Sequence, residues 1–103
     1  MNNEQQQIID EVFGNYSKMV WRITNMPLYT KEEFINKCKT DTEFSEKWGL
    51  QIEERELGVE ERNKWSWDNW GITCEMESVL DEQEVPTKLI TVTYNNIKIE
   101  SYE

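Results

Sequence analysis

The chain contains no histidine, which removes the side chain that most often serves proteins as a general base and as a metal ligand. Nucleophile pairs of the Ser–His and Cys–His kinds are excluded for the same reason. The four glycines (Gly14, Gly49, Gly58, Gly71) are scattered singly, so no glycine-rich loop is present to cradle a phosphate group. We therefore predict that the protein is not an enzyme, and we assign no catalytic residue, no metal ligand and no cofactor.

Long apolar runs are absent as well. Residues 1–7 are polar and lack the basic and apolar regions of a secretory signal, and no apolar run approaches the length of a membrane span. Only two cysteines occur, Cys38 and Cys74, and such a pair is more often two reduced core thiols than a disulfide. We expect a cytoplasmic protein with no membrane partner.

The apolar residues that are present suffice for one modest core. The 103 residues are 37% hydrophobic and 12% aromatic, which fits the size and composition of a single domain. Disordered chains combine high net charge with few aromatics, and this chain has only the first of these properties. We therefore expect residues 1–103 to form one folded domain.

Helical signals dominate the first half of the chain. Apolar residues recur at helical spacing over about residues 4–17, which predicts an amphipathic helix. Thr30 and Thr40 each precede a glutamate at capping-box spacing, and Gly49 stands where a helix would end. This pattern predicts two short helices before Leu50.

Alternation of apolar and polar residues predicts the strands. The segments with this pattern are Met19–Thr24, Ile72–Leu80, Leu89–Tyr94 and Ile97–Tyr102. Asn95 and Asn96 tolerate positive φ and form a plausible two-residue type I′ turn between the last two strands. Residues 50–65 are ambiguous, and we favour a strand from Leu50 followed by a short helix from Val59.

These elements predict an α+β fold. We expect an antiparallel sheet of three to four strands, with the amphipathic helices packed on one face and a polar opposite face.

Negative charge is the strongest feature of the composition. The formal net charge is −10, and residues 53–84 hold eleven Asp and Glu against three Lys and Arg. Such a surface repels phosphate and favours a basic partner, so direct binding of nucleic acid is not expected. The carboxylates predicted to contact the partner are those of Glu75, Glu77, Asp81, Glu82 and Glu84. The same run of charge also fits a surface that only keeps the domain soluble.

Three tryptophans, Trp65, Trp67 and Trp70, stand close together in the acidic region. Indoles so placed can anchor a protein partner or stack on a ligand, although burial of at least two of them in the core is the alternative. We expect Asp68 and Asn69 to form a surface turn that leaves Trp67 exposed. Trp67 and Trp70 are therefore assigned as partner contacts.

The segment Trp67-Asp68-Asn69-Trp70-Gly71, followed by an alternating strand, resembles the N-W-G string of small ferredoxin-like proteins encoded by phages and mobile elements. The resemblance is confined to this segment. It implies a small α+β protein of phage type.

Together these observations predict an acidic protein-binding module that inhibits a nucleic-acid-handling host protein, such as a nuclease, by mimicking DNA. Its partner would be a basic protein surface that contacts carboxylates in place of phosphates. One alternative is a small-molecule-binding domain or minor enzyme that uses the segment Trp65–Trp70 as a pocket wall. The other is a structural or assembly subunit that pairs through Ile97–Tyr102.

Overall fold

The computed structural model describes residues 1–24 and 29–103, and within them it contains five helices and three strands. Their order is α1 (Asn3–Thr24), α2 (Lys31–Thr40), α3 (Thr42–Trp48), β1 (Leu50–Glu56), α4 (Val59–Trp70), α5 (Glu77–Glu82), β2 (Lys88–Tyr94) and β3 (Ile97–Tyr102). The predicted α+β class is confirmed, with a three-stranded sheet in the described residues.

The sheet is antiparallel, with the strands in the order β1-β2-β3. The central residue Val92 of β2 lies opposite Ile52 of β1 and Ile99 of β3. Asn95 and Asn96 connect β2 to β3 with φ angles of 49° and 67°. Positive φ at both residues is the requirement of a type I′ turn, so the predicted hairpin is confirmed.

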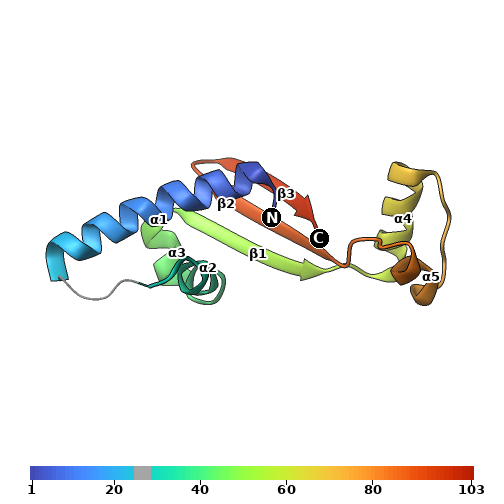
Figure 1. Ribbon diagram of the computed structural model, residues 1–103, viewed down its shortest axis with the longest axis horizontal. Helices are drawn as coiled ribbons and strands as arrows, with labels where there is room; N and C mark the ends of the chain where they lie inside the picture. The colour runs from blue at the N-terminus through green and yellow to red at the C-terminus, as the bar shows by residue number, and fades with distance from the viewer. Residues whose placement is uncertain (25–28) are drawn as a thin grey trace.

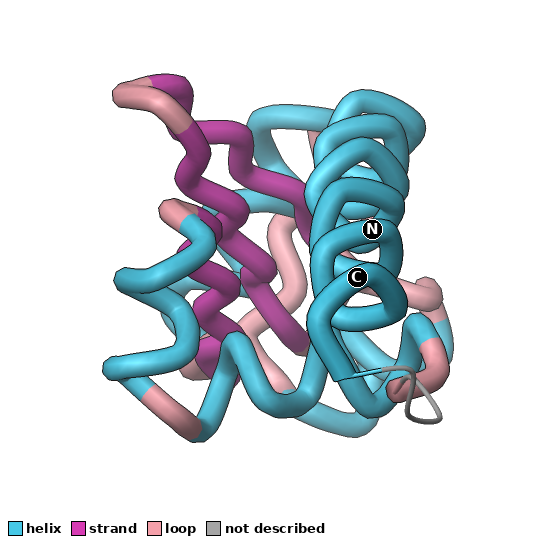
Figure 2. Tube along the Cα trace, turned by 90° about the vertical axis from the view of Figure 1, so that its left-hand side faces the viewer, coloured by secondary structure: helices cyan, strands magenta, loops and turns pink. Residues whose placement is uncertain are grey.

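One face of the sheet is apolar and the helices α1, α2 and α3 cover it (Figure 1). In the view along the long axis, α1 forms a layer beside the strands (Figure 2). Leu50, Ile52 and Val92 point into this layer and are at most 2% exposed. The register places mainly polar side chains on the opposite face: Gln51, Glu53, Thr91, Thr93, Lys98 and Glu100.

The main core is aromatic at its centre. Phe34 and Ile9 are completely buried, and the Tyr16 ring lies 5.1 Å from both the Phe34 and the Trp48 rings, measured between centroids. Burial raises the pKa of the Tyr16 hydroxyl, with a smaller contribution from Tyr29. Because Trp48 ends α3 and Tyr16 lies on α1, these ring contacts join the two helices.

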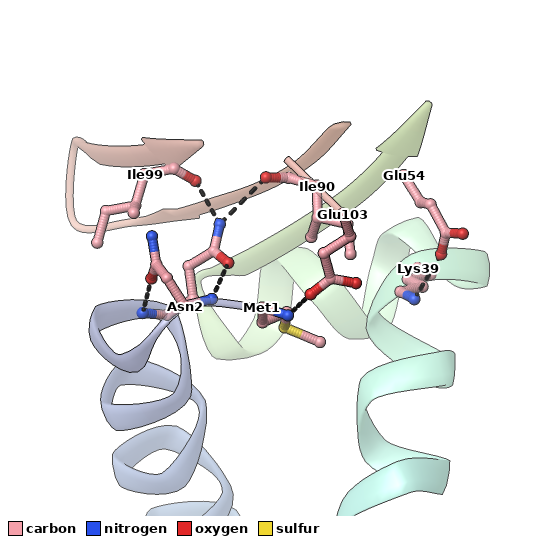
Figure 3. Close-up of polar contacts among 8 residues, drawn as sticks. Met1, Asn2, Lys39, Glu54, Ile90, Ile99 and Glu103 are labelled. Atoms are coloured by element: carbon pink, nitrogen blue, oxygen red, sulfur yellow. Dashed lines mark hydrogen bonds and ion pairs between the residues drawn. The ribbon is translucent and has the colours of Figure 1, made fainter. Parts of the chain in front are cut away.

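The start of α1 is fixed to the sheet by Gln5, which is completely buried. Its hydrogen-bond partners Asn2, Ile90 and Ile99 are labelled in Figure 3. The Gln5 and Asn2 side chains each accept a hydrogen bond from the other's backbone N–H, at 3.1 and 2.9 Å. The Gln5 amide also donates to the Ile90 and Ile99 carbonyl oxygens of β2 and β3, at 3.1 and 2.7 Å. A capping residue that also bonds to two strands sets where α1 begins and where it lies.

The predicted strand Met19–Thr24 is wrong, because α1 continues through these residues to Thr24. Met19, Trp21 and Ile23 alternate as in a half-buried strand, yet their exposed fractions are 48%, 58% and 75%. This end of α1 projects past the sheet (Figure 1), and among the described residues no strand lies beside it. A helix forms its own backbone hydrogen bonds and can project in this way, whereas a strand needs a neighbour.

Of the two predicted N-terminal caps, the one at Thr30 is confirmed and the one at Thr40 is wrong. The Thr30 hydroxyl accepts a hydrogen bond from the Glu33 N–H at 3.2 Å, as predicted for the start of α2. At the start of α3, however, Asp41 rather than Thr40 is the cap, and its side chain accepts from the Phe44 N–H at 3.1 Å. Gly49 ends α3 with a φ of 66°, the left-handed conformation that glycine adopts at little cost.

The molecule is long, with principal extents of 54 × 24 × 21 Å and a radius of gyration of 17.1 Å. A compact domain of this length would have a radius of gyration of about 13 Å. The difference arises because the end of α1 projects past the sheet at one end of the molecule, while α4 and α5 lie beyond the sheet at the other end (Figure 1). The helices α4 and α5 therefore do not lie on the face of the sheet. They have a small core of their own, formed by Cys74, Leu80 and Val85.

Candidate partner-binding arm

The predicted site residues lie in the segment 57–87, which we call the acidic arm. The arm is inserted between β1 and β2, whose last pair is Glu56 and Lys88. One more backbone hydrogen bond, from the Leu57 N–H to the Thr87 oxygen at 2.8 Å, closes its base. The arm holds eight Asp and Glu against two Lys and Arg. Strand pairing therefore brings a strongly acidic segment to one end of the molecule.

A buried arginine holds the arm together. Arg62 of α4 is 4% exposed, and its guanidinium donates to the carbonyl oxygens of Pro86 and Val85, each at 3.1 Å. It also donates to the Asp81 carboxylate of α5 at 2.7 Å. The remaining cation of the arm, Lys64, is exposed. The charges of Arg62 and Asp81 are thus paired with each other inside the arm.

The tryptophan segment is helical. Asp68 and Asn69, predicted to form a surface turn, instead lie in the last turns of α4, so that prediction is wrong. The helix ends at Trp70, and its C-cap Gly71 has a φ of 66° and donates its N–H to the Trp67 oxygen at 3.0 Å. Local polar residues support the helix in place of a turn, since the Asn69 amide donates to the Trp65 oxygen at 3.0 Å.

The three indoles have different environments. Trp67 is 59% exposed and Trp70 is 44% exposed, so the predicted exposure of Trp67 is confirmed. Trp65 is half-buried and packs against the small core of the arm. The Trp70 ring contacts the Trp65 ring edge-on, with centroids 5.0 Å apart. The structure therefore leaves Trp67 and Trp70 accessible to a partner while Trp65 is held in place.

The predicted strand Ile72–Leu80 is wrong, because residues 71–76 form neither helix nor strand and Glu77 begins α5. Cys74 and Leu80 turn inward, whereas Ile72 and Met76, their partners in the alternating pattern, are 39% and 64% exposed. The Cys74 N–H donates to the Asn63 side chain at 2.7 Å rather than to a strand. The sheet position expected for this segment is taken by β1.

All five predicted carboxylates are exposed, but Glu75 and Glu77 do not lie on the predicted strand Ile72–Leu80, because that segment is not a strand. Glu75 lies in the connection before α5, Glu84 follows α5 with a φ of 56°, and the others lie on α5. Asp81 is paired with Arg62. For the other four, no ion pair is found in the described ranges, so Glu75, Glu77, Glu82 and Glu84 are available to a partner.

A cavity lies beside α4, and three of its lining residues, Trp65, Asp68 and Asn69, belong to the segment that the small-molecule alternative treats as a pocket wall. It measures about 390 Å³ and is lined by Leu57, Glu61, Lys64, Trp65, Asp68, Asn69 and Tyr102. Tyr102 comes from β3, and its ring centroid lies 6.5 Å from that of Trp65. Only the fold brings these two rings together.

Both cysteines are free and buried, Cys38 in the main core and Cys74 in the arm, as predicted. Burial raises the pKa of the Cys38 thiol to about 11. Across residues 1–24 and 29–103, no group of three or more Cys, Asp and Glu side chains is arranged to hold a metal ion. In the same ranges, every helix is too short or too polar to cross a bilayer.

Comparison with known proteins yields no match to a protein family, to a curated protein or to a solved structure.

Proposed function

We propose that the protein is an acidic protein-binding module that inhibits a nucleic-acid-handling host protein, as phages do with host nucleases, by occupying its basic groove. The observation that carries this proposal is the acidic arm. It projects from the end of the sheet and presents four free carboxylates together with the exposed Trp67 and Trp70.

The physical basis is competition for the cations that bind DNA. Duplex DNA carries about one negative charge per 1.7 Å, so its binding grooves are lined with Lys and Arg. Carboxylates on the acidic arm would pair with the same cations. Exposed indoles add contact area of the kind that dominates binding energy once it is desolvated at an interface. Charge brings the partner in, and Trp67 and Trp70 anchor it.

Asp81 has a different role from its neighbours. Because its carboxylate pairs with the buried Arg62, we expect its replacement to weaken the arm as well as any interface. A charge-reversal test should therefore leave Asp81 unchanged.

The test compares two variants with the same net charge. The first reverses four carboxylates of the arm to lysine: Glu75, Glu77, Glu82 and Glu84. The matched control reverses four exposed carboxylates outside the arm: Glu11, Glu46, Glu53 and Glu100. Each variant and the wild type are immobilised and used to capture proteins from a host lysate.

We expect the wild type and the control to retain one basic protein that the arm variant loses. Duplex DNA should elute this protein, and capture should weaken steeply as salt rises. Equal capture by the arm variant, or a captured protein that DNA does not elute, would contradict the proposal.

A further inference from the structure

The cavity beside α4 has walls suited to an organic cation. The Trp65 and Tyr102 rings both line it, with their planes inclined at 56° and their centroids 6.5 Å apart. Cations bind the faces of such rings, and tryptophan binds them best. The volume of about 390 Å³ lies within the usual range of small-ligand sites.

The aromatic wall is already in place without a ligand. Trp65 packs against the buried cluster of Cys74, Leu80 and Val85, and the Trp70 ring supports it edge-on. Tyr102 is held by the pairing of β3 with β2, where it lies opposite Leu89. A preformed wall lowers the entropy cost of binding.

Charged side chains complete the cavity. Glu61 and Asp68 stand four residues before and three residues after Trp65, so all three lie on one side of α4. The charge of Glu61 is already compensated by Arg55 at 2.8 Å, and this contact lowers the pKa of the Glu61 carboxyl. No ion pair to Asp68 is found in the described residues. Lys64 also lines the cavity and would repel a bound cation.

We propose that this cavity binds the guanidinium group of an arginine side chain, with the guanidinium against the Trp65 and Tyr102 rings and bonded to the Asp68 carboxylate. The proposal rests on the function proposed above, in which the arginine belongs to the basic partner. Guanidinium fits better than ammonium because it is planar, stacks on aromatic rings, donates to carboxylates in a fork and is more weakly hydrated.

The test titrates the protein with N-acetyl-arginine amide while NMR follows the indole N–H signals. N-acetyl-citrulline amide serves as the control, because citrulline has nearly the same shape without the charge. We expect saturable shifts of the Trp65 signal, with a dissociation constant on the order of 1 mM for so small a ligand. Citrulline should bind at least about tenfold more weakly, and the lysine analogue should also bind more weakly than arginine.

Substitutions of the residues that line the cavity should change the affinity for arginine in opposite directions. Tyr102→Leu and Asp68→Asn, both at exposed positions, should each weaken arginine binding by about two- to fivefold. Lys64→Gln should strengthen it, because a like charge leaves the cavity. Trp67→Ala should change nothing, because Trp67 does not line the cavity.

Equal binding of arginine and citrulline, an unmoved Trp65 signal, or weaker binding by Lys64→Gln would each overturn the proposal. Equal binding of lysine would overturn the preference for guanidinium. The titration needs no partner, so its result is independent of the capture experiment. The cavity can fail to bind arginine while the charge-reversal variant still loses the captured protein. Conversely, the cavity can bind arginine while the capture experiment contradicts the proposed function.

Discussion

Arg62 has a structural role that the charge pattern of the sequence does not indicate. In the sequence it is a rare cation in an acidic segment, and such residues are usually exposed. In the structure its guanidinium is buried. It donates hydrogen bonds to the Asp81 carboxylate of α5 and to the carbonyl oxygens of Val85 and Pro86, which lie just before β2. The arm therefore depends on a cation that no partner can reach.

Replacing Arg62 by methionine should destabilise the protein. The change removes hydrogen bonds from a charged donor and leaves the buried Val85 carbonyl without that partner, which we expect to cost about 2–3 kcal/mol. Urea denaturation followed by circular dichroism measures this loss. The control is Lys64→Met two residues away, which should shift stability by less than about 0.5 kcal/mol because Lys64 is exposed. Equal stability of the two variants would show that the hydrogen bonds of Arg62 do not stabilise the arm.

The tryptophans Trp48 and Trp67 should differ as a core residue differs from a surface residue. Trp48 is half-buried against Tyr16, and Trp67 is 59% exposed. Trp48→Ala should cost about 3 kcal/mol, whereas Trp67→Ala should change the stability by no more than about 0.5 kcal/mol.

Thermal melting of both variants tests this difference. If Trp67→Ala melts as early as Trp48→Ala, the arm uses Trp67 as a core residue and the indole is not free for a partner. If the captured partner is bound through Trp67, the same variant should lose about 2 kcal/mol or more of binding energy at an unchanged melting temperature.

At the scale of elements, Glu54 connects three of them. Its carboxylate on β1 contacts Lys88 of β2 at 2.7 Å and Lys39 of α2 at 2.9 Å (Figure 3 shows the Lys39 contact). Hydrogen bonds from Lys88 and then Lys39 lower the pKa of Glu54 to about 2. This pairing holds α2 against the edge of the sheet.

Because the pKa of Glu54 is lower in the folded protein than in the unfolded chain, the stability of the protein depends on pH in the acidic range. The contribution of Glu54 is fully present above the pKa of the unfolded chain, near 4.5, and is lost as the pH falls toward about 2. We therefore expect Glu54→Gln to be less stable than wild type at neutral pH, with the difference closing between those two pH values.

Urea midpoints measured across this pH range test the prediction. Glu53→Gln is the matched control, because Glu53 lies on the opposite face of β1, and no ion pair to it is found in the described residues. Its curve should run parallel to the wild type. The Glu54 difference should also shrink at high salt, because the pair is exposed to solvent.

At the scale of the molecule, the main core and the core of the arm are separate. This separation contributes to the elongated form and places the acidic arm beyond the end of the sheet, apart from α1, α2 and α3 (Figure 1). It also places the cavity beside Trp65 at the junction of the arm with β3.

Small-angle X-ray scattering tests this shape directly. The expected radius of gyration is close to 17.1 Å, increased slightly by the hydration layer. A value of about 13 Å, typical of a compact domain of this length, would mean that the arm folds back onto the sheet. In that case Trp67 would be shielded and the cavity would close.

The features that could be predicted from the sequence alone are local ones. The cap at Thr30, the end of α3 at Gly49 and the turn at Asn95 and Asn96 follow from φ preferences and hydrogen bonds within a few residues. The exposure of the arm carboxylates could also be predicted, since unpaired carboxylates stay in water. Trp67 is exposed as predicted, but on a helix rather than beside the expected turn.

Which alternating segments became strands depends on contacts between distant parts of the chain. Met19–Thr24 and Ile72–Leu80 have the pattern of strands but pair with no strand in the described residues, whereas β1, whose pattern is weaker, pairs with β2 over its whole length. A strand's hydrogen bonds come from another part of the chain, so its sequence alone cannot establish it. The same reason applies to the pairing of Arg62 with Asp81 and to the cavity, because each joins residues that meet only through the fold.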